Sequence, residues 1–193
     1  MAVKVLLIRH GLTRLGEEHR YQGSLDDGLS ERGRAELKRA ELSPARVFVS
    51  PAKRARETAE ILFPQAEQIV CPGLREMDFG MFEGRGWWEM EDDPAYNAWI
   101  ESECRSRCPQ GEDREGFSER VCAAFEEILA RGGHGDVLVL VAHGGTQMAL
   151  LEHCGRPSRE YYRWQRPCGC GWELDYDPTE KTLTVEREIA FLK

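Results

Sequence analysis

The chain has 193 residues, of which 41% are hydrophobic, and a formal net charge of −8 at pH 7. A chain of this length buries about 70% of its surface on folding, so a single domain needs no disulfide or metal for stability. The longest uninterrupted apolar run, residues 137–142, is far shorter than the ~20 residues that span a bilayer. The apolar start is too short for a signal peptide, so we expect a cytoplasmic protein that does not contact membranes.

The negative charge is concentrated in one segment. Residues 76–119 contain thirteen acidic residues and four arginines, which gives a net charge of −9, and the rest of the chain is close to neutral. Binding of nucleic acid requires a basic face, so this balance disfavours a nucleic-acid partner. We interpret the acidic segment as a solvated helical insertion.

The seven cysteines also restrict the possible functions. In the cytoplasm they are reduced thiols by default. The pairs Cys104-x3-Cys108 and Cys168-x-Cys170 lack the two-residue spacing of a zinc knuckle. The sequence therefore argues against a metal site.

The predicted elements alternate between strands and helices along the chain. Strands are predicted at 3–8, 46–49, 68–71 and 136–142, followed by a hairpin of 172–176 and 183–188. Helices are predicted at 31–42, 51–62, 114–131 and 146–154, with short helices near 87–92 and 95–102. This order predicts an α/β fold of three layers, α/β/α. Residues 1–193 would form one domain, with residues 77–113 as an inserted cap.

Two of the predicted strands end at a histidine that is followed by glycine. Residues 5–11 read Val-Leu-Leu-Ile-Arg-His-Gly, and residues 137–142 lead into His143-Gly144-Gly145. In open α/β sheets, ligands bind beyond the carboxyl ends of the strands. Arg9 offers a planar fork of donors that matches a phosphate, and His10 is a nucleophile toward phosphorus. The two histidines therefore suggest one shared phosphate site.

A basic helix follows the second predicted strand. Arg54 and Thr58 share a face of this helix at a spacing of i, i+4. A cation near a helix N-terminus opposes the helix dipole unless it contacts an anion, which makes Arg54 a candidate phosphate ligand. The alternative is an ordinary basic surface helix.

The loop of residues 74–84 carries glycines together with apolar and aromatic side chains. Such a loop is not a solvated linker, and we expect it to pack over a cleft and to direct Glu76 inward. A salt bridge between Glu76 and Arg75 is the alternative.

These motifs resemble the histidine phosphatase superfamily, the phosphoglycerate-mutase-like enzymes, in the same order and over nearly the whole chain. The resemblance is carried by Arg9-His10-Gly11 with Thr13, Gln22-Gly23, Asp26, Leu29-Ser30, Ser50-Pro51 with Arg54-Ala55 and Thr58-Ala59, Glu76 with Phe79-Gly80 and Glu83-Gly84, and His143-Gly144-Gly145. Residues 20–23, 76–84, 94–100 and 111–115 are most similar to the α-ribazole phosphatases of cobalamin nucleotide-loop assembly. The resemblance implies a six-stranded, mostly parallel sheet flanked by helices, and no metal or other cofactor.

The chemistry of phosphoryl transfer assigns roles to these residues. His10 would attack phosphorus through one ring nitrogen while a hydrogen bond to the other fixes its tautomer. Arg9, Arg54 and His143 would hold the phosphoryl oxygens and supply the positive charge that Mg²⁺ supplies in other enzymes. Glu76 would protonate the leaving group and then activate water.

Further residues are candidates for substrate binding: Thr13, Gln22, Gly23, Gly144, Trp87 and Trp88. The two tryptophans would stack on an aromatic leaving group, unless they are core anchors of the cap. We expect Trp99 and Trp164 to belong to the core. One position departs from the family, because Gly16 stands where asparagine is usual. A donor to the phosphate is then missing, unless Thr13, Gln22 or the Gly23 N–H replaces it.

The sequence thus predicts a metal-independent phosphomonoesterase that acts through a phosphohistidine, with α-ribazole 5′-phosphate as the candidate substrate. A broad-specificity or sugar-phosphate phosphatase is an alternative. A phosphoglycerate mutase is disfavoured because such chains carry longer insertions and tails. A non-catalytic phosphate-binding module is disfavoured because all the candidate catalytic residues are present. We expect a small phosphomonoester as the partner, and a monomer or homodimer.

Overall fold

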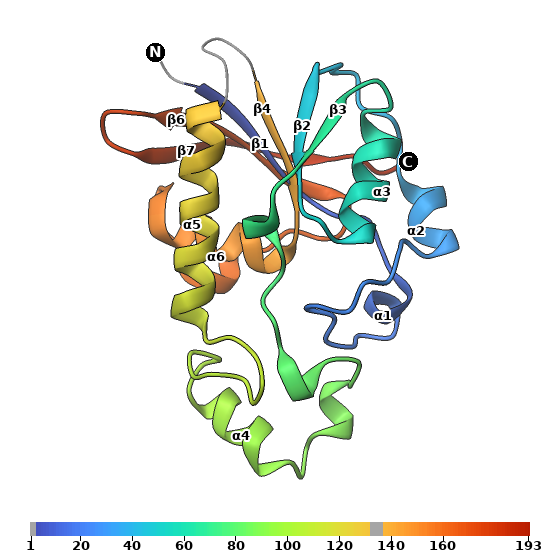
Figure 1. Ribbon diagram of the computed structural model, residues 1–193, viewed down its shortest axis with the longest axis vertical. Helices are drawn as coiled ribbons and strands as arrows, with labels where there is room; N and C mark the ends of the chain where they lie inside the picture. The colour runs from blue at the N-terminus through green and yellow to red at the C-terminus, as the bar shows by residue number, and fades with distance from the viewer. Residues whose placement is uncertain (1–2, 132–136) are drawn as a thin grey trace.

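Seven strands form one mixed sheet in the computed structural model, which describes residues 3–131 and 137–193 (Figure 1). The strands are β1 (Val3–Arg9), β2 (Arg46–Val49), β3 (Glu67–Val70), β4 (Leu138–Ala142), β5 (Gly155–Arg156), β6 (Cys170–Asp177) and β7 (Thr182–Ala190). Their order across the sheet is β3-β2-β4-β1-β6-β7-β5. Only β6 runs antiparallel to its neighbours. The fold is the predicted one, with a seventh strand because the two-residue β5 pairs with β7.

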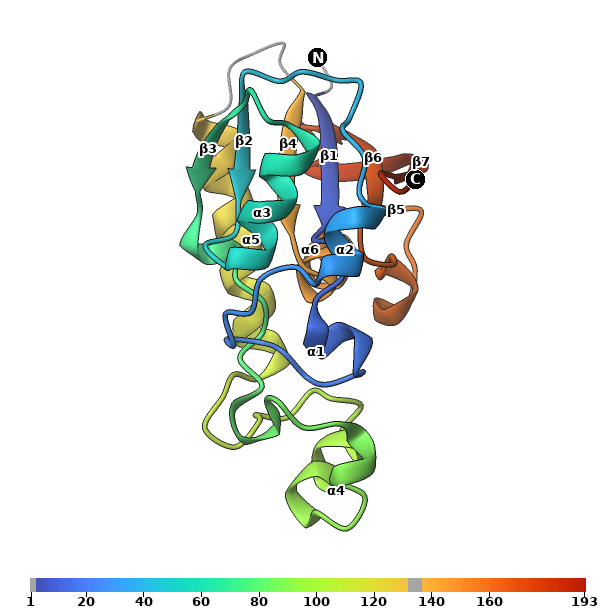
Figure 2. The same ribbon diagram turned by 90° about the vertical axis from the view of Figure 1, so that its right-hand side faces the viewer.

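Helices cover both faces of this sheet, so the molecule has the predicted three layers (Figure 2). The helices are α1 (Arg14–Glu17), α2 (Glu31–Glu36), α3 (Lys53–Leu62), α4 (Pro94–Glu101), α5 (Arg114–Arg131) and α6 (Gly144–Cys154). Short 3₁₀ helices lie at Pro72–Leu74, Gly80–Phe82, Trp87–Glu89 and Tyr161–Trp164. No helix among the described residues is long and apolar enough to cross a membrane.

The alternation of side chains along β1 explains the two hydrophobic cores. Val5 and Leu7 pack into one core with side chains of α5 and α6, whereas Leu6 and Ile8 pack into a second core with α3. Successive strand residues point to opposite faces, so a central strand that is buried on both faces is apolar throughout. The burial of each such side chain contributes about 1.5–3 kcal/mol to folding.

Most element boundaries lie within two residues of the predicted ones, but the helix predicted at 31–42 ends at Glu36. There the backbone of the chain turns toward the C-terminal segment. Leu37 pairs with Leu192, and the Lys38 N–H donates to the Phe191 carbonyl at 3.0 Å. These tertiary hydrogen bonds replace the helical ones. Asp136, the predicted start of the fourth strand, lies outside the described residues.

Residues 77–113, which we call the cap, lie beyond the carboxyl ends of β1 and β4 (Figures 1 and 2). Phe82, Met90, Tyr96 and Trp99 are buried within the cap and continue the core that contains Val5 and Leu7. Many acidic groups of the segment are paired with arginines. The pairs include Arg85 with Asp93, Arg107 with Asp113 and Arg120 with Glu112.

Candidate active site

The strand register brings three polar residues to one edge of the sheet. In the parallel ladders, Arg9 lies opposite Ala142 and Val49 opposite Val141. The residues after these positions stay in register, because the His10 N–H donates to the Ala142 carbonyl at 2.9 Å and the Ser50 N–H to the Val141 carbonyl at 3.0 Å. His10, Ser50 and His143 therefore lie side by side where the strands end.

The His10 ring is fixed by a backbone hydrogen bond. Its Nδ1 lies 2.7 Å from the Gly11 carbonyl oxygen. A carbonyl can only accept, so the proton resides on Nδ1 and the lone pair on Nε2. Burial is the largest cause that holds the pKa of His10 well below its usual value, and the positive charges of Arg54 and Arg9 lower this pKa further. The ring is 6% exposed and is neutral at pH 7, the state that a nucleophile requires.

A chain of hydrogen bonds connects the His10 backbone to α3. The Gly11 N–H donates to Thr58 Oγ1 at 2.9 Å, and the Thr58 hydroxyl donates to the Arg54 carbonyl at 2.6 Å. Thr58 therefore couples the carbonyl that orients His10 to the helix that carries Arg54.

The Arg54 guanidinium is 1% exposed and is held by a loop that the cap supports. It donates to the carbonyls of Gly23 at 2.8 Å and Leu25 at 2.7 Å. The Glu83 carboxylate accepts the N–H of Ser24 at 2.6 Å and that of Leu25 at 3.0 Å, which orders the same loop. Gly23 has φ +23, and a Cβ there would come within 2.0 Å of Glu83 Oε1. Glycine is required at this turn.

Glu76 is held by two backbone donors instead of pairing with Arg75. Its Oε1 accepts the Met77 N–H and its Oε2 the Gly145 N–H, each at 3.0 Å. A Cβ on Gly145 would lie 2.0 Å from Glu76 Oε1, so the second glycine of the His143-Gly144-Gly145 motif makes room for this carboxylate. The loop directs Glu76 inward, as expected from its apolar composition.

His143 is fully buried beside His10, with the two ring centroids 5.2 Å apart. Burial, followed by the charge of Arg54, lowers the pKa of His143 well below its usual value. In this arrangement the His143 imidazole is therefore held toward its neutral form. A neutral imidazole contributes a hydrogen bond, and the charge at this end comes from Arg9 and Arg54.

Buried donors without partners gather at this edge. Within residues 3–131 and 137–193, they are Arg9 Nε, Gln22 Nε2, Arg54 Nε, His143 Nδ1, Trp99 Nε1, Trp164 Nε1 and Arg166 Nε. The first four belong to candidate site residues. Buried polar groups normally have hydrogen-bond partners, so this concentration of unpaired donors indicates that the site binds an anion.

Four residues of this set, Arg9, Gln22, Arg54 and Trp99, line one cavity with a volume of about 310 Å³. Its polar end is lined by Arg9, His10, Thr13, Gly16, Gln22, Gly23, Arg54, Glu76 and Gly145. The remaining wall is mostly aromatic and apolar, including Tyr21, Phe79, Trp99, Phe117, Met148, Tyr161 and Tyr162, with Arg20 and Gln165 as its polar members. His143 and Gly144 lie next to the cavity but do not line it. A Cβ on Gly144 would lie 3.3 Å from Arg9 Cζ.

Trp87 and Trp88, which we expected to contact substrate, do not line this cavity. Their side chains are 55% and 43% exposed, and they pack edge to face against each other with centroids 6.0 Å apart. They are not core anchors either. Trp99 is in the core, as expected, and it also lines the cavity, with Tyr21 and Phe79 at centroid distances of 5.8 and 6.1 Å. Trp164 is in the core.

The first turn after β1 orders the remaining polar candidates. Thr13 Oγ1 accepts the Gly16 N–H at 3.0 Å and donates to Gln22 Oε1 at 2.7 Å. Because the Gln22 oxygen is occupied by Thr13, its Nε2 remains as the unpaired donor. Gln22 thus supplies an N–H donor at the cavity, where the glycine at position 16 has no side-chain donor to offer.

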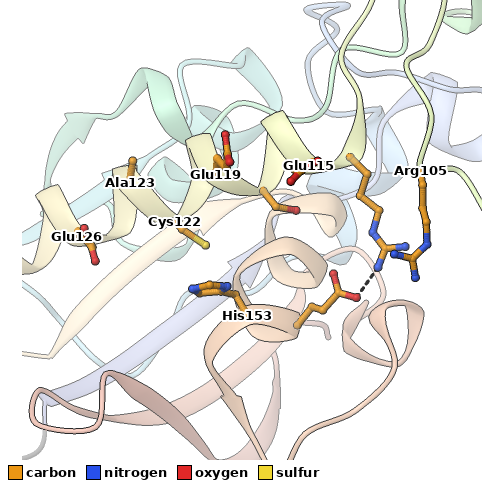
Figure 3. Close-up of a pocket in the computed structure, with 10 residues that line it drawn as sticks. Arg105, Glu115, Glu119, Cys122, Ala123, Glu126 and His153 are labelled. Carbon is orange, nitrogen blue, oxygen red and sulfur yellow. Dashed lines mark hydrogen bonds and ion pairs between the residues drawn. The ribbon is translucent and has the colours of Figure 1, made fainter.

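A larger hollow of about 780 Å³ lies between α5 and α6 (Figure 3). Its lining includes Glu119, Cys122, Glu126 and His153, and Arg114 pairs with Glu152 across it. None of its lining residues has a buried donor without a partner. The described part of the chain contains no group of three or more histidine, cysteine or carboxylate side chains placed to hold a metal ion. This hollow therefore lacks the features of the strand-end site.

Comparisons with known proteins agree with this geometry. A family model for the histidine phosphatase superfamily (branch 1) matches residues 5–188. An adenosylcobalamin/alpha-ribazole phosphatase of Escherichia coli K12 is 28% identical over 193 residues, which covers 95% of each chain. A metal-independent phosphoserine phosphatase of Arabidopsis thaliana is 32% identical over 159 residues, which covers 76% of this chain and 66% of that one.

Two solved structures are similar to this chain over nearly its whole length. The alpha-ribazole phosphatase from Shigella flexneri superimposes with a TM-score of 0.79 at 26% identity, over 98% of this chain and 96% of that one. A phosphoglycerate mutase from Thermus thermophilus gives a TM-score of 0.72 at 29% identity, over 97% and 99%. The family match extends over nearly all of the chain, so the chain belongs to branch 1 of the histidine phosphatase superfamily, a family of phosphatases and mutases.

Proposed function

We propose that the chain hydrolyses phosphomonoesters through a phosphohistidine at His10, and that its substrate is α-ribazole 5′-phosphate, dephosphorylated in cobalamin nucleotide-loop assembly. The observation that carries this proposal is the division of one cavity into two ends. One end gathers unpaired donors and two arginines around His10, and the other is a wall of aromatic side chains.

In the first step, the His10 Nε2 lone pair attacks phosphorus, and a nitrogen–phosphorus bond forms as the bond to the leaving oxygen breaks. Arg9, Arg54 and Gln22 hold the phosphoryl oxygens, where charge develops in the transition state. Glu76, in its protonated form, gives its proton to the leaving oxygen. Its two backbone contacts keep the carboxyl group at the cavity wall.

In the second step, water replaces the departed alcohol. Glu76, now a carboxylate, removes a proton from the water as its oxygen attacks phosphorus. The nitrogen–phosphorus bond breaks, and the pair of electrons returns to His10 Nε2. Inorganic phosphate leaves, and both His10 and Glu76 regain their starting protonation states. No step requires a metal ion, because the arginines supply the positive charge.

The aromatic wall supports a neutral, planar leaving group. Tyr21, Phe79 and Trp99 pack together at this end, and flat rings stack favourably on such a surface. The Trp99 Nε1 donor has no partner among the described residues, and it offers one polar contact at the wall. A small polyanion has no flat ring to stack on these side chains. Relatives that carry the α-ribazole phosphatase name at 26–28% identity point in the same direction.

A side-by-side kinetic comparison tests the proposal. The panel contains α-ribazole 5′-phosphate, 3-phosphoglycerate, phosphoserine, a sugar phosphate and p-nitrophenyl phosphate, each with EDTA present. We expect turnover in EDTA and a kcat/KM for α-ribazole 5′-phosphate at least ~10-fold above that for 3-phosphoglycerate, which requires only ~1.4 kcal/mol of differential binding. If phosphoserine or a sugar phosphate is preferred, the cobalamin assignment is wrong and the phosphatase assignment stands. Loss of all activity in EDTA contradicts the metal-free mechanism.

A further inference from the structure

The hydroxyl group of Ser50 is fully buried and contacts the ring of His143. Ser50 directly follows β2, and its side chain has 0% exposure. Its Oγ lies 2.7 Å from His143 Nε2. The Ser50 backbone is fixed by the hydrogen bond to Val141, so the hydroxyl is held at a constant place relative to the sheet.

The direction of this hydrogen bond follows from the other partner of Ser50. Its Oγ accepts the Ala52 N–H at 3.3 Å. A backbone N–H can only donate, so the Ser50 hydroxyl still has its own proton to place. Within the described chain, His143 Nε2 is the acceptor in reach. The reverse direction would leave a buried hydroxyl proton without an acceptor, which is unfavourable.

The tautomer of His143 then follows. A neutral imidazole carries one proton, and Nε2 is occupied as an acceptor, so the proton resides on Nδ1. This Nδ1 is buried and has no partner among residues 3–131 and 137–193. The ring lies against His10 at 5.2 Å between centroids, close to Arg9 and Arg54.

We infer that Ser50 is a positioning residue that holds His143 in the Nδ1–H tautomer and thereby supplies a hydrogen-bond donor to the phosphoryl group at His10. The link to the phosphoryl group rests on the proposed function, whereas the tautomer assignment stands on the hydrogen bonds alone. Without the serine hydroxyl, the proton could move to Nε2, and Nδ1 would present a lone pair to the phosphate oxygens.

Nitrogen NMR of protein labelled with ¹⁵N-histidine tests the tautomer directly. The signals of His143 are identified as those that are missing from the spectrum of the His143→Asn variant. We expect the wild type at pH 7.5 to show a protonated Nδ1 and an unprotonated Nε2 at this residue. In Ser50→Ala, a signal from protonated Nε2 should appear, and Ser50→Thr, which keeps a hydroxyl, should restore the wild-type pattern. Thr146→Val removes an equally buried hydroxyl that donates to the Leu74 carbonyl, and it should leave the tautomer unchanged.

Titration with inorganic phosphate tests the second half of the inference without any turnover. We expect Ser50→Ala to raise the Kd for phosphate about tenfold, and Ser50→Thr to recover most of the loss. A wild-type His143 protonated on Nε2, or a Ser50→Ala spectrum identical to the wild type, would overturn the assignment. A change of tautomer without a change in phosphate affinity would overturn the link to phosphate. If the wild type binds phosphate as expected but hydrolyses no ester, the proposed function fails and this inference does not.

Discussion

The two ends of the cavity are built in different ways. The phosphate end is fixed by backbone: His10 and His143 follow adjacent parallel strands, and Gly11, Gly23 and Gly145 allow close approach of the chain. The aromatic end is formed largely by side chains of the cap and of loops, which pack on one another with few constraints from the sheet. This difference suggests that the sheet determines the reaction and that the cap determines which ester enters.

The largest effect should come from removing the nucleophile. His10→Ala should reduce turnover of every ester to background while leaving the fold intact, because the ring lies at a strand end and fills little of the core. With labelled substrate, the wild type should trap an acid-labile, base-stable phosphoprotein that His10→Ala does not form. Full activity of His10→Ala would contradict the phosphohistidine mechanism.

Replacing Glu76 should lower the rate of hydrolysis by a factor that depends on the leaving group. Loss of a general acid costs ~10²–10⁴ in rate, so Glu76→Gln should show such a loss for alkyl phosphates. The loss should shrink for p-nitrophenyl phosphate, whose leaving group departs without a proton. Glu119→Gln, in the hollow between α5 and α6, is the matched control and should be neutral. An equal loss for alkyl and aryl esters would instead point to a structural role of Glu76.

The phosphate end should also make the fold sensitive to pH. Burial lowers the pKa of both His10 and His143 below 6.5, so below that pH the unfolded chain binds protons that the folded chain does not. The free energy of unfolding is therefore independent of these two rings above pH 6.5, and it declines as the pH falls below that value. Each histidine contributes a slope of up to ~1.4 kcal/mol per pH unit.

Urea denaturation between pH 7.5 and 5.5 measures this slope. His10→Gln removes one titrating ring, so its unfolding free energy should fall less steeply with decreasing pH than that of the wild type. Carboxylates that titrate in the same range affect both proteins alike. Parallel curves for the two proteins would show that His10 is not held neutral by the fold.

The sequence predicted the phosphate end far better than the aromatic end. Apolar runs that stop at histidine and glycine mark strand ends, and parallel strands bring their ends together, so the proximity of His10 and His143 follows from local pattern alone. The cap has no such periodicity. Which of its tryptophans faces the cavity depends on how the 3₁₀ turns and α4 pack, so the pattern alone does not reveal that Trp99, and not Trp87 or Trp88, lines the cavity of this structure.

Long-range contacts account for the other differences. The early end of α2 depends on hydrogen bonds to residues more than 150 positions away. The neutral state of His143 depends on burial behind His10, which no local motif records. Ser50 and Thr58 belong to the family motif, but only the structure reveals that their hydroxyls contact His143 and the Gly11 N–H.

Trp99 should control selection at the aromatic end. Trp99→Leu should lower kcat/KM for α-ribazole 5′-phosphate about tenfold, ~1.4 kcal/mol, because the stacking surface is lost. Hydrolysis of p-nitrophenyl phosphate, which has a much smaller aromatic group, should change less. Trp87→Leu alters an exposed tryptophan of the same cap outside the cavity and serves as the control. If Trp87→Leu changes the substrate preference and Trp99→Leu does not, the wall is assigned to the wrong residues.

The smallest effect should come from restoring the donor that the phosphate end lacks. Gly16 lines the cavity, and a Cβ there would lie 3.1 Å from Thr13 Oγ1, so a side chain fits after a shift of a few tenths of an ångström. Gly16→Asn should lower the inhibition constant of inorganic phosphate about fivefold, because one hydrogen bond to a charged group contributes ~1 kcal/mol. Gly16→Ala adds the Cβ without the donor and separates crowding from hydrogen bonding. If the two variants bind phosphate equally, the Gln22 Nε2 donor already occupies that position, and the departure of this chain from its family at Gly16 is compensated within the same turn.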